Sequence, residues 1–232
     1  LARCFKAALG ADIESGFLRL TYKEAMNRFG SDKPDMRFAM ELTDLASIFQ
    51  DSQFKVFKGA LDSGGVVKAI NAKGFACITT GQINHLTETA KLHGAKGLAF
   101  IKVENGEWKS PIVKFFSEEE KTRLTEAMAI EEGDLILFGA GDWPTVCEVL
   151  GRIRLECAGY LKTNEGNTDW KFLWVTDFPL LSLDKETGKW NAVHHPFTRP
   201  KKEDIHLLEK GDNLGEIRAE AYDVVLNGHE IG

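Results

Sequence analysis

Between Met40 and Tyr160 the chain alternates short apolar runs, typical of strands, with longer stretches that have helical spacing. This alternation constrains the fold more than any other feature, because strands and helices joined by their own turns can bury a common core. The chain of 232 residues is 43% hydrophobic, which suffices for one large domain or two. The pattern therefore predicts an α+β domain within the chain.

Turn and cap residues place the elements of this block. Asp62 to Gly65 indicates a hairpin, Asn105-Gly106 favours a second tight turn, and Ser117 is placed to cap an acidic helix. The expected strands are 54–57, 66–70, 97–103 and 134–139, and the expected helices are 80–92, 117–128 and 143–160.

The flanking segments also carry clear signals. Residues 1–9 have the pattern of an amphipathic helix, and Thr21 and Glu24 have capping-box spacing before a helix over 22–29 that should end at Gly30. Later in the chain we expect a buried strand at 172–175, a hairpin loop at 184–189, a returning strand at 190–193 and a helical stretch at 201–210.

Composition excludes several classes of protein. A formal net charge of −6 gives no general basic field for nonspecific nucleic-acid binding. No apolar run approaches the roughly 20 residues that span a bilayer, so we expect no membrane segment. The four cysteines form no CxxC pair, which favours buried, reduced thiols and a cytoplasmic location.

The adjacent His194 and His195 are the first candidate for chemistry. Consecutive side chains at a strand end face different ways, so at most one easily points into a given pocket. An imidazole can donate to a carboxylate, which is one way to recognise an acidic small molecule. Structural hydrogen bonding is the simpler interpretation of the pair from residues alone.

Asp223 and Glu230 are the second candidate, seven residues apart with Asn227-Gly228 between them. A hairpin at that turn would bring the two carboxylates together, where their oxygens could hold Mg²⁺ beside a nucleotide. Surface carboxylates remain the simpler interpretation without further evidence. The chain has no GxxxxGK[ST] loop, GxSxG elbow or HExxH helix, which disfavours P-loop and hydrolase functions.

Four stretches resemble, in the same order, segments of bacterial and mitochondrial aspartyl-tRNA synthetases. They are 28–37 (RFGSDKPDMR), 174–179 (WVTDFP), 194–198 (HHPFT) and 222–232 (YDVVLNGHEIG). Inside the central block, 94–99 (GAKGLA) and 110–115 (SPIVKF) resemble stretches of the GAD domain that this family carries as an insertion.

The resemblance implies a fold and a reaction. The expected fold class is α+β, with part of the antiparallel catalytic sheet of a class II synthetase and an inserted α+β GAD domain. Residues 1–40 and 161–232 would belong to the catalytic core, and 41–160 to the insertion. The family joins L-aspartate to ATP as aspartyl-adenylate and passes the aspartyl group to the 3′ end of tRNA-Asp.

Roles for individual residues follow from the same resemblance. His194 matches the position that contacts aspartate, and His195 would support the same positive pocket. Glu230 matches the carboxylate that holds ATP and Mg²⁺, with Asp223 as its partner. No acid or base is assigned, and no role is assigned within the loop at 30–37.

The resemblance also implies that the chain is a segment of a longer enzyme. The family's anticodon-binding barrel and both essential arginines lie outside it, so we expect the isolated chain to be inactive. The intact enzyme is expected to be a homodimer, with charging of tRNA-Asn left open. The alternatives are a non-catalytic insertion module that binds tRNA or a protein partner, and an amidotransferase-associated domain.

Overall fold

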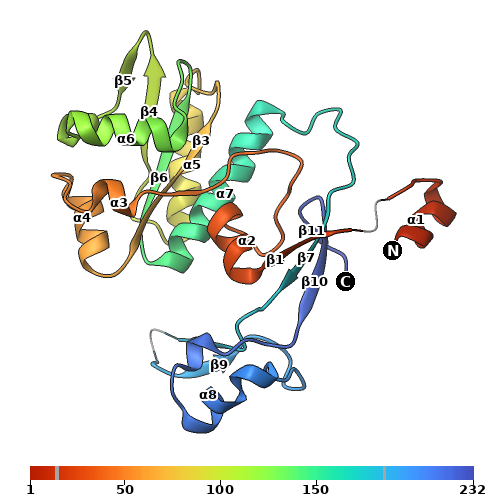
Figure 1. The fold of residues 1–232 in the computed structure, drawn as a ribbon. Coiled ribbons are helices and arrows are strands. Elements are labelled where there is room, and N and C mark those ends of the chain that lie inside the picture. Colours follow the sequence, from red (N-terminus) through yellow and green to blue (C-terminus); the bar gives the residue numbers. More distant parts are fainter. Residues whose placement is uncertain (14–15, 185–186) are drawn as a thin grey trace. The chain divides into compact units, whose positions relative to one another are not determined.

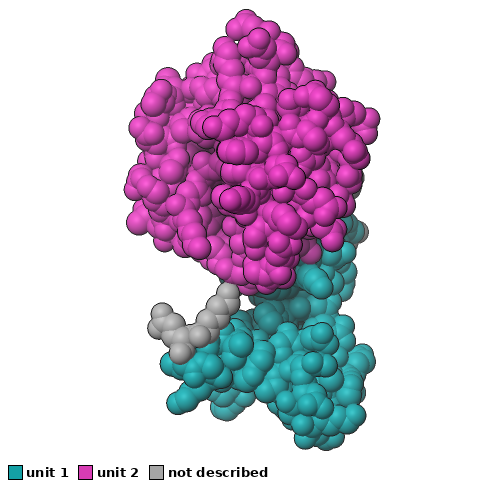
Figure 2. Space-filling view, turned by 90° about the vertical axis from the view of Figure 1, so that its left-hand side faces the viewer, with its two compact units in different colours: residues 1–25, 32–36, 168–232 teal, residues 26–31, 37–167 magenta. Residues whose placement is uncertain are grey.

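The computed structural model describes residues 1–13, 16–184 and 187–232. The chain forms two compact units, which are coloured separately in Figure 2. Unit 1 comprises residues 1–25, 32–36 and 168–232, and unit 2 comprises residues 26–31 and 37–167. Most of unit 2 is therefore a single insertion into the sequence of unit 1.

Unit 2 is built on a five-stranded sheet in which every neighbouring pair is antiparallel (Figure 1). The strand order is β2-β3-β6-β4-β5. The strands are β2 (Thr43–Asp44), β3 (Val66–Ala72), β6 (Leu135–Gly141), β4 (Ala99–Glu104) and β5 (Glu107–Lys109).

Helices cover both faces of this sheet. The helices are α3 (Ala46–Phe49), α4 (Lys55–Asp62), α5 (Thr80–Leu92), α6 (Glu118–Met128) and α7 (Trp143–Leu161), with a 3₁₀ turn η1 (Val113–Phe115). The core between the sheet and α3, α4 and α6 is aromatic, with Phe49, Phe57, Phe116 and Phe138 all buried. Burying each ring contributes about 1.5–3 kcal/mol, so this cluster accounts for much of the stability of unit 2.

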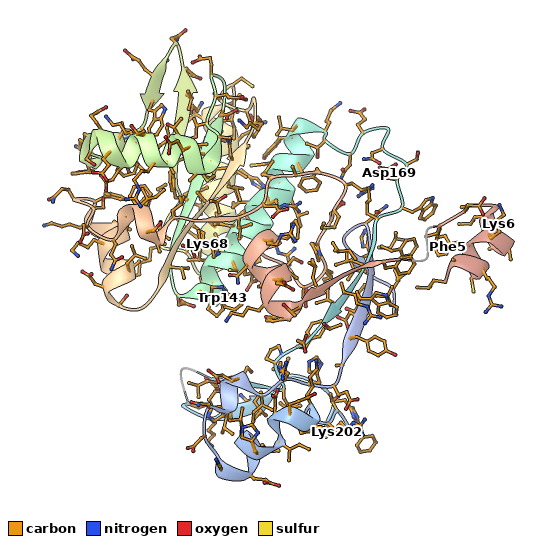
Figure 3. The ribbon with its side chains drawn as sticks, in the orientation of Figure 1. Phe5, Lys6, Lys68, Trp143, Asp169 and Lys202 are labelled. Carbon is orange, nitrogen blue, oxygen red and sulfur yellow. The ribbon has the colours of Figure 1, made fainter. Side chains whose placement is uncertain are left out.

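The helix α2 (Tyr22–Phe29) begins and ends as its sequence predicts. The Thr21 N–H donates to Glu24 at 2.8 Å and the Glu24 N–H donates back to Thr21 Oγ1 at 3.1 Å, which completes the capping box. Asn27 near its end accepts from Trp143 Nε1 at 2.7 Å through its side chain and from Lys68 Nζ at 3.5 Å through its carbonyl (Figure 3). The last turn of α2 is thereby tied to β3 and α7.

The predicted strand at 54–57 is wrong, because most of it forms the helix α4. Phe57 and Leu61 are spaced by one helical turn and pack against the aromatic core, while Lys58 pairs with Asp62 at 3.2 Å in i,i+4 spacing. The β-branched and aromatic content of 54–57 favours a strand locally, and the longer helical spacing overrides it. The following strand β3 forms as expected.

The hairpin predicted at Asp62 to Gly65 is also wrong, because these residues lead from the end of α4 into β3, which pairs with β2 and β6. The other predicted strands and helices of the block are confirmed. Capping boxes start α5 at Thr79 and Gln82 and α6 at Ser117 and Glu120. β4 and β5 turn at Asn105-Gly106, both at positive φ (58° and 74°) as a tight two-residue hairpin requires. α7 ends at Leu161, one residue beyond its expected range of 143–160.

Unit 2 reaches beyond the insertion predicted at 41–160. The guanidinium of Arg154 on α7 donates to the carbonyls of Phe38, Ala39 and Met40, which holds this segment against the helix. Compact packing does not test where an inserted domain begins, so the boundaries of 1–40, 41–160 and 161–232 stay a prediction.

Unit 1 contains a four-stranded sheet in the order β1-β7-β10-β11. Its strands are β1 (Leu18–Thr21), β7 (Phe172–Thr176), β10 (Tyr222–Leu226) and β11 (His229–Glu230). The β1–β7 pair is parallel and the other pairs are antiparallel. The expected strand at 172–175 is therefore an inner strand of this sheet.

Shorter elements complete unit 1. They are α1 (Ala2–Leu9), the hairpin of β8 (Leu181–Leu183) and β9 (Trp190–Ala192), η2 (Lys202–Asp204), α8 (Ile205–Lys210) and η3 (Leu214–Glu216). Phe5 of α1 meets Trp170 and Phe172 edge-on, with ring centroids 5.1 and 5.2 Å apart (Figure 3). The loop predicted at 184–189 includes residues 185–186, which lie outside the described residues.

The cysteines are free thiols, but only two of the four are buried as expected. Cys4 and Cys77 are exposed. Burial raises the pKa of Cys147 to about 11 and that of Cys157 to about 12, so both remain protonated and unreactive near neutral pH. In the part of the chain that the structure describes, no helix is long and apolar enough to cross a membrane.

Candidate functional site

The hairpin of β10 and β11 brings Asp223 and Glu230 to the same side of the unit 1 sheet. Val225 pairs with Glu230 across the two strands, and Asp223 lies two residues before Val225 on the same face of β10. The turn uses Asn227 and Gly228 at positive φ (51° and 86°). The hairpin expected from the sequence therefore forms.

Asn227 fixes the turn to the segment that precedes β7. Its side-chain amide donates to the Asp169 carbonyl at 2.9 Å, and its side-chain oxygen accepts from the Lys171 N–H at 2.9 Å (Figure 3 labels Asp169). These two bonds restrain the hairpin that carries the carboxylates.

The surroundings of Asp223 are electrostatically suited to a cation. Burial raises the pKa of Asp223, and the nearby carboxylates of Glu230 and Asp32 raise it further, while His194 and Lys33 act in the opposite direction. A bound cation would relieve the repulsion between these carboxylates. Oxygen ligands at this position fit Mg²⁺, which commonly takes one or two protein carboxylates and completes its shell with water and phosphate.

The described residues contain no group of three or more His, Cys, Asp and Glu side chains arranged to hold a metal ion. Two carboxylates alone bind Mg²⁺ weakly. The donor set therefore fits an ion that arrives with a phosphate ligand better than a resident structural metal.

His194 lies just after β9, with its ring edge-on to Phe178 at 5.5 Å between centroids. Its Nε2 atom is buried and has no hydrogen-bond partner. Buried polar atoms are nearly always paired, so this nitrogen marks a place where a ligand can supply the missing partner. Among the two histidines, it is His194 whose charge acts on Asp223.

His195 is exposed and makes local contacts. Its Nδ1 accepts the N–H of Phe197 at 3.2 Å, and its ring stands edge-on to Phe197 at 4.7 Å. The pair thus diverges, as alternation predicts. That His195 supports the same pocket stays a prediction, because these contacts give no evidence for it.

A charged network joins the residue that follows β7 to the start of η2 and to the segment before β10. Asp177 adopts a left-handed backbone (φ 59°), pairs with Lys201, and lies 3.7 Å from Arg218. Arg218 in turn donates to both oxygens of Asp204 at 2.7 and 2.9 Å. Ion pairing outweighs burial and lowers the pKa of Asp177, which keeps the network charged.

Stability at low pH tests this network. The bonds from Arg218 lower the pKa of Asp204 from 3.8 to about 2. Because the folded pKa lies below the unfolded one, the stabilisation is present above about pH 4 and is lost as the pH falls towards 2. We expect Asp204→Asn to reduce stability at neutral pH and to flatten the loss between pH 4 and 2. Urea unfolding at a series of pH values measures this, and parallel curves would contradict it.

Two residues near the site carry no role in the sequence-based assignment. Asp32 and Lys33 belong to the loop at 32–36, which is far from β10 in sequence but acts on Asp223. The sequence feature that could have indicated a role for them is the concentration of charge in 28–37, a stretch that also carries the family resemblance. Only the folded chain shows that this loop belongs with the carboxylates in unit 1.

Comparison with known proteins agrees with this architecture. Residues 57–150 match the GAD domain family. The chain is 51% identical to the aspartate–tRNA(Asp/Asn) ligase of Opitutus terrae over 236 aligned residues, covering 100% of this chain and 39% of that protein. It is 50% identical to the aspartate–tRNA ligase of Geobacillus kaustophilus, and the match covers 100% of this chain and 39% of that protein. It is 48% identical to the aspartate–tRNA(Asp/Asn) ligase of Methylacidiphilum infernorum, and the match covers 98% of this chain and 38% of that protein.

These findings define a GAD domain inserted into part of a class II synthetase catalytic sheet, and they confirm the predicted α+β fold class. The chain spans about two-fifths of the length of its curated relatives. Over its length the chain is similar to one part of bacterial aspartate–tRNA ligases, as the ordered sequence stretches predict.

Proposed function

We propose that the full-length protein containing this chain activates L-aspartate with ATP to aspartyl-adenylate and transfers the aspartyl group to the 3′ end of tRNA-Asp. The observation that carries the proposal is the placement of paired carboxylates, Asp223 and Glu230, near the buried, unpartnered Nε2 of His194. The names of the relatives supply the substrate class. Some of these names also include tRNA-Asn, so tRNA-Asp is the acceptor common to them.

Each residue has a distinct task in this proposal. Asp223 and Glu230 would hold Mg²⁺ through oxygen atoms and thereby orient the phosphates of ATP. When bound, Mg²⁺ supplies charge neutralisation at the phosphate under attack. The imidazole of His194 would donate to or charge-pair with the aspartate substrate.

The rest of the proposal concerns the full-length enzyme. Because the chain spans about two-fifths of its relatives, we expect the isolated 232 residues to lack activity. We further propose a cytoplasmic homodimer. Neither property depends on the geometry of the carboxylate pair.

ATP–pyrophosphate exchange by the purified full-length protein tests the proposal. We expect exchange with L-aspartate, and none with asparagine or glutamate, because an amide or one extra methylene mismatches a site built for the aspartate carboxylate. The isolated chain serves as a control and should give no exchange. Exchange that depends on another amino acid, or on none, would refute the proposal.

A further inference from the structure

The loop at 32–36 is seated on the turn that joins the two carboxylate-bearing strands. Pro34 and Asp35 are buried, with Asp35 only 5% exposed. A Cβ atom on Gly228 would lie 3.2 Å from Asp35 Cβ and 3.7 Å from its backbone. Gly228 at φ 86° therefore lets the loop approach the turn closely, and this contact fixes the position of the loop.

This seating leaves Lys33 exposed beside the carboxylates. Lys33 and Asp32 both belong to the electrostatic surroundings of Asp223, together with Glu230 and His194. The five charged or titratable groups come from the loop, from β10 and β11 and from the segment after β9, so their grouping depends on the fold of unit 1.

Within this chain, the carboxylate strands bring no positive charge of their own to a bound nucleotide. The carboxylates of Asp223 and Glu230 offset the charge of one Mg²⁺, so the negative charges of a triphosphate would find no surplus positive charge on β10 and β11. A lysine ammonium is a flexible point charge that commonly binds phosphate. Lys33 is the lysine among the groups that act on Asp223.

We propose that Lys33 contacts the phosphate chain of ATP and that the loop at 32–36 forms one wall of the nucleotide site. The inference rests on the proposed function and adds a substrate-positioning residue from a segment far upstream of the carboxylates. Asp35 and Gly228 hold the loop in register with the turn, and Lys33 makes the contact.

The test uses the full-length protein with Lys33→Met, Lys33→Arg and a control, Lys23→Met, which removes another exposed lysine of unit 1. Calorimetric titration with MgATP and the exchange assay are both measured. Losing one charge-assisted contact should raise the Kd and the KM for ATP about 10-fold or more in Lys33→Met. Lys33→Arg should recover most of the affinity, and Lys23→Met should match the wild type.

The outcomes separate this inference from the proposed function. An unchanged Kd for MgATP in Lys33→Met, or an increase confined to the KM for aspartate, would overturn the inference while aspartate-dependent exchange stands. The inference would also be overturned if Lys33→Met lost thermal stability together with affinity for MgATP and Lys33→Arg did not recover that affinity. A wild-type protein that binds MgATP but does not exchange with aspartate refutes only the proposed function.

Discussion

Replacing Arg154 with alanine is expected to destabilise unit 2 by about 3–5 kcal/mol. The side chain is 1% exposed and donates to the carbonyls of Met40, Phe38 and Ala39 at 3.0, 2.9 and 3.0 Å. Its guanidinium also lies 3.9 Å from the centre of the Phe38 ring. The substitution removes the donor from three partly buried backbone carbonyls and opens a cavity where the buried side chain of Arg154 lies.

Arg152→Ala is the matched control, because Arg152 is an exposed arginine on the same helix. Its removal should change stability by less than about 0.5 kcal/mol. Urea unfolding of both variants and the wild type measures the difference. Equal stability of the two variants would show that the bonds to 38–40 contribute little.

Glu230→Gln is expected to lower aspartate-dependent exchange by the full-length protein about 100- to 1,000-fold. The amide keeps the shape of the side chain but removes the negative charge that offsets Mg²⁺ beside Asp223. Because Glu230 is exposed at the end of the β10–β11 hairpin, the substitution should leave folding unchanged. The exchange assay at saturating aspartate measures the effect.

Glu216→Gln provides the control for this second prediction, since it removes one negative charge from another exposed glutamate of unit 1. It should retain the activity of the wild type. Raising the Mg²⁺ concentration should recover part of the activity of Glu230→Gln, because the lost carboxylate weakens ion binding. If Glu230→Gln exchanged at the rate of the wild type, Glu230 would not be part of the site.

Elements that depend on neighbouring residues could be predicted from the sequence. The capping boxes at Thr21 and Ser117 and the turn at Asn105-Gly106 each involve groups within three residues of one another. The prediction of a strand at 54–57 failed because the strand propensity of these residues is outweighed by the packing of α4 on the aromatic core. That packing is set by residues distant in sequence.

In the candidate site, too, the parts set by neighbouring residues could be predicted and the parts set by distant residues could not. The Asp223–Glu230 hairpin was predictable because its turn lies between the two carboxylates. The loop at 32–36 was not, because nearly 190 residues separate it from β10. The importance of Arg154 also depends on partners 114 to 116 residues away. The orphaned Nε2 of His194 is likewise visible only in the folded chain.

The central claim is that one site binds both the nucleotide and aspartate. Its most direct test is equilibrium binding of a sulfamoyl analogue of aspartyl-adenylate to the full-length protein. Our account predicts binding about 100-fold or more tighter than that of AMP, weakened by His194→Ala and by Glu230→Gln. An affinity no greater than that of AMP, or equal affinity for the asparaginyl analogue, would contradict it.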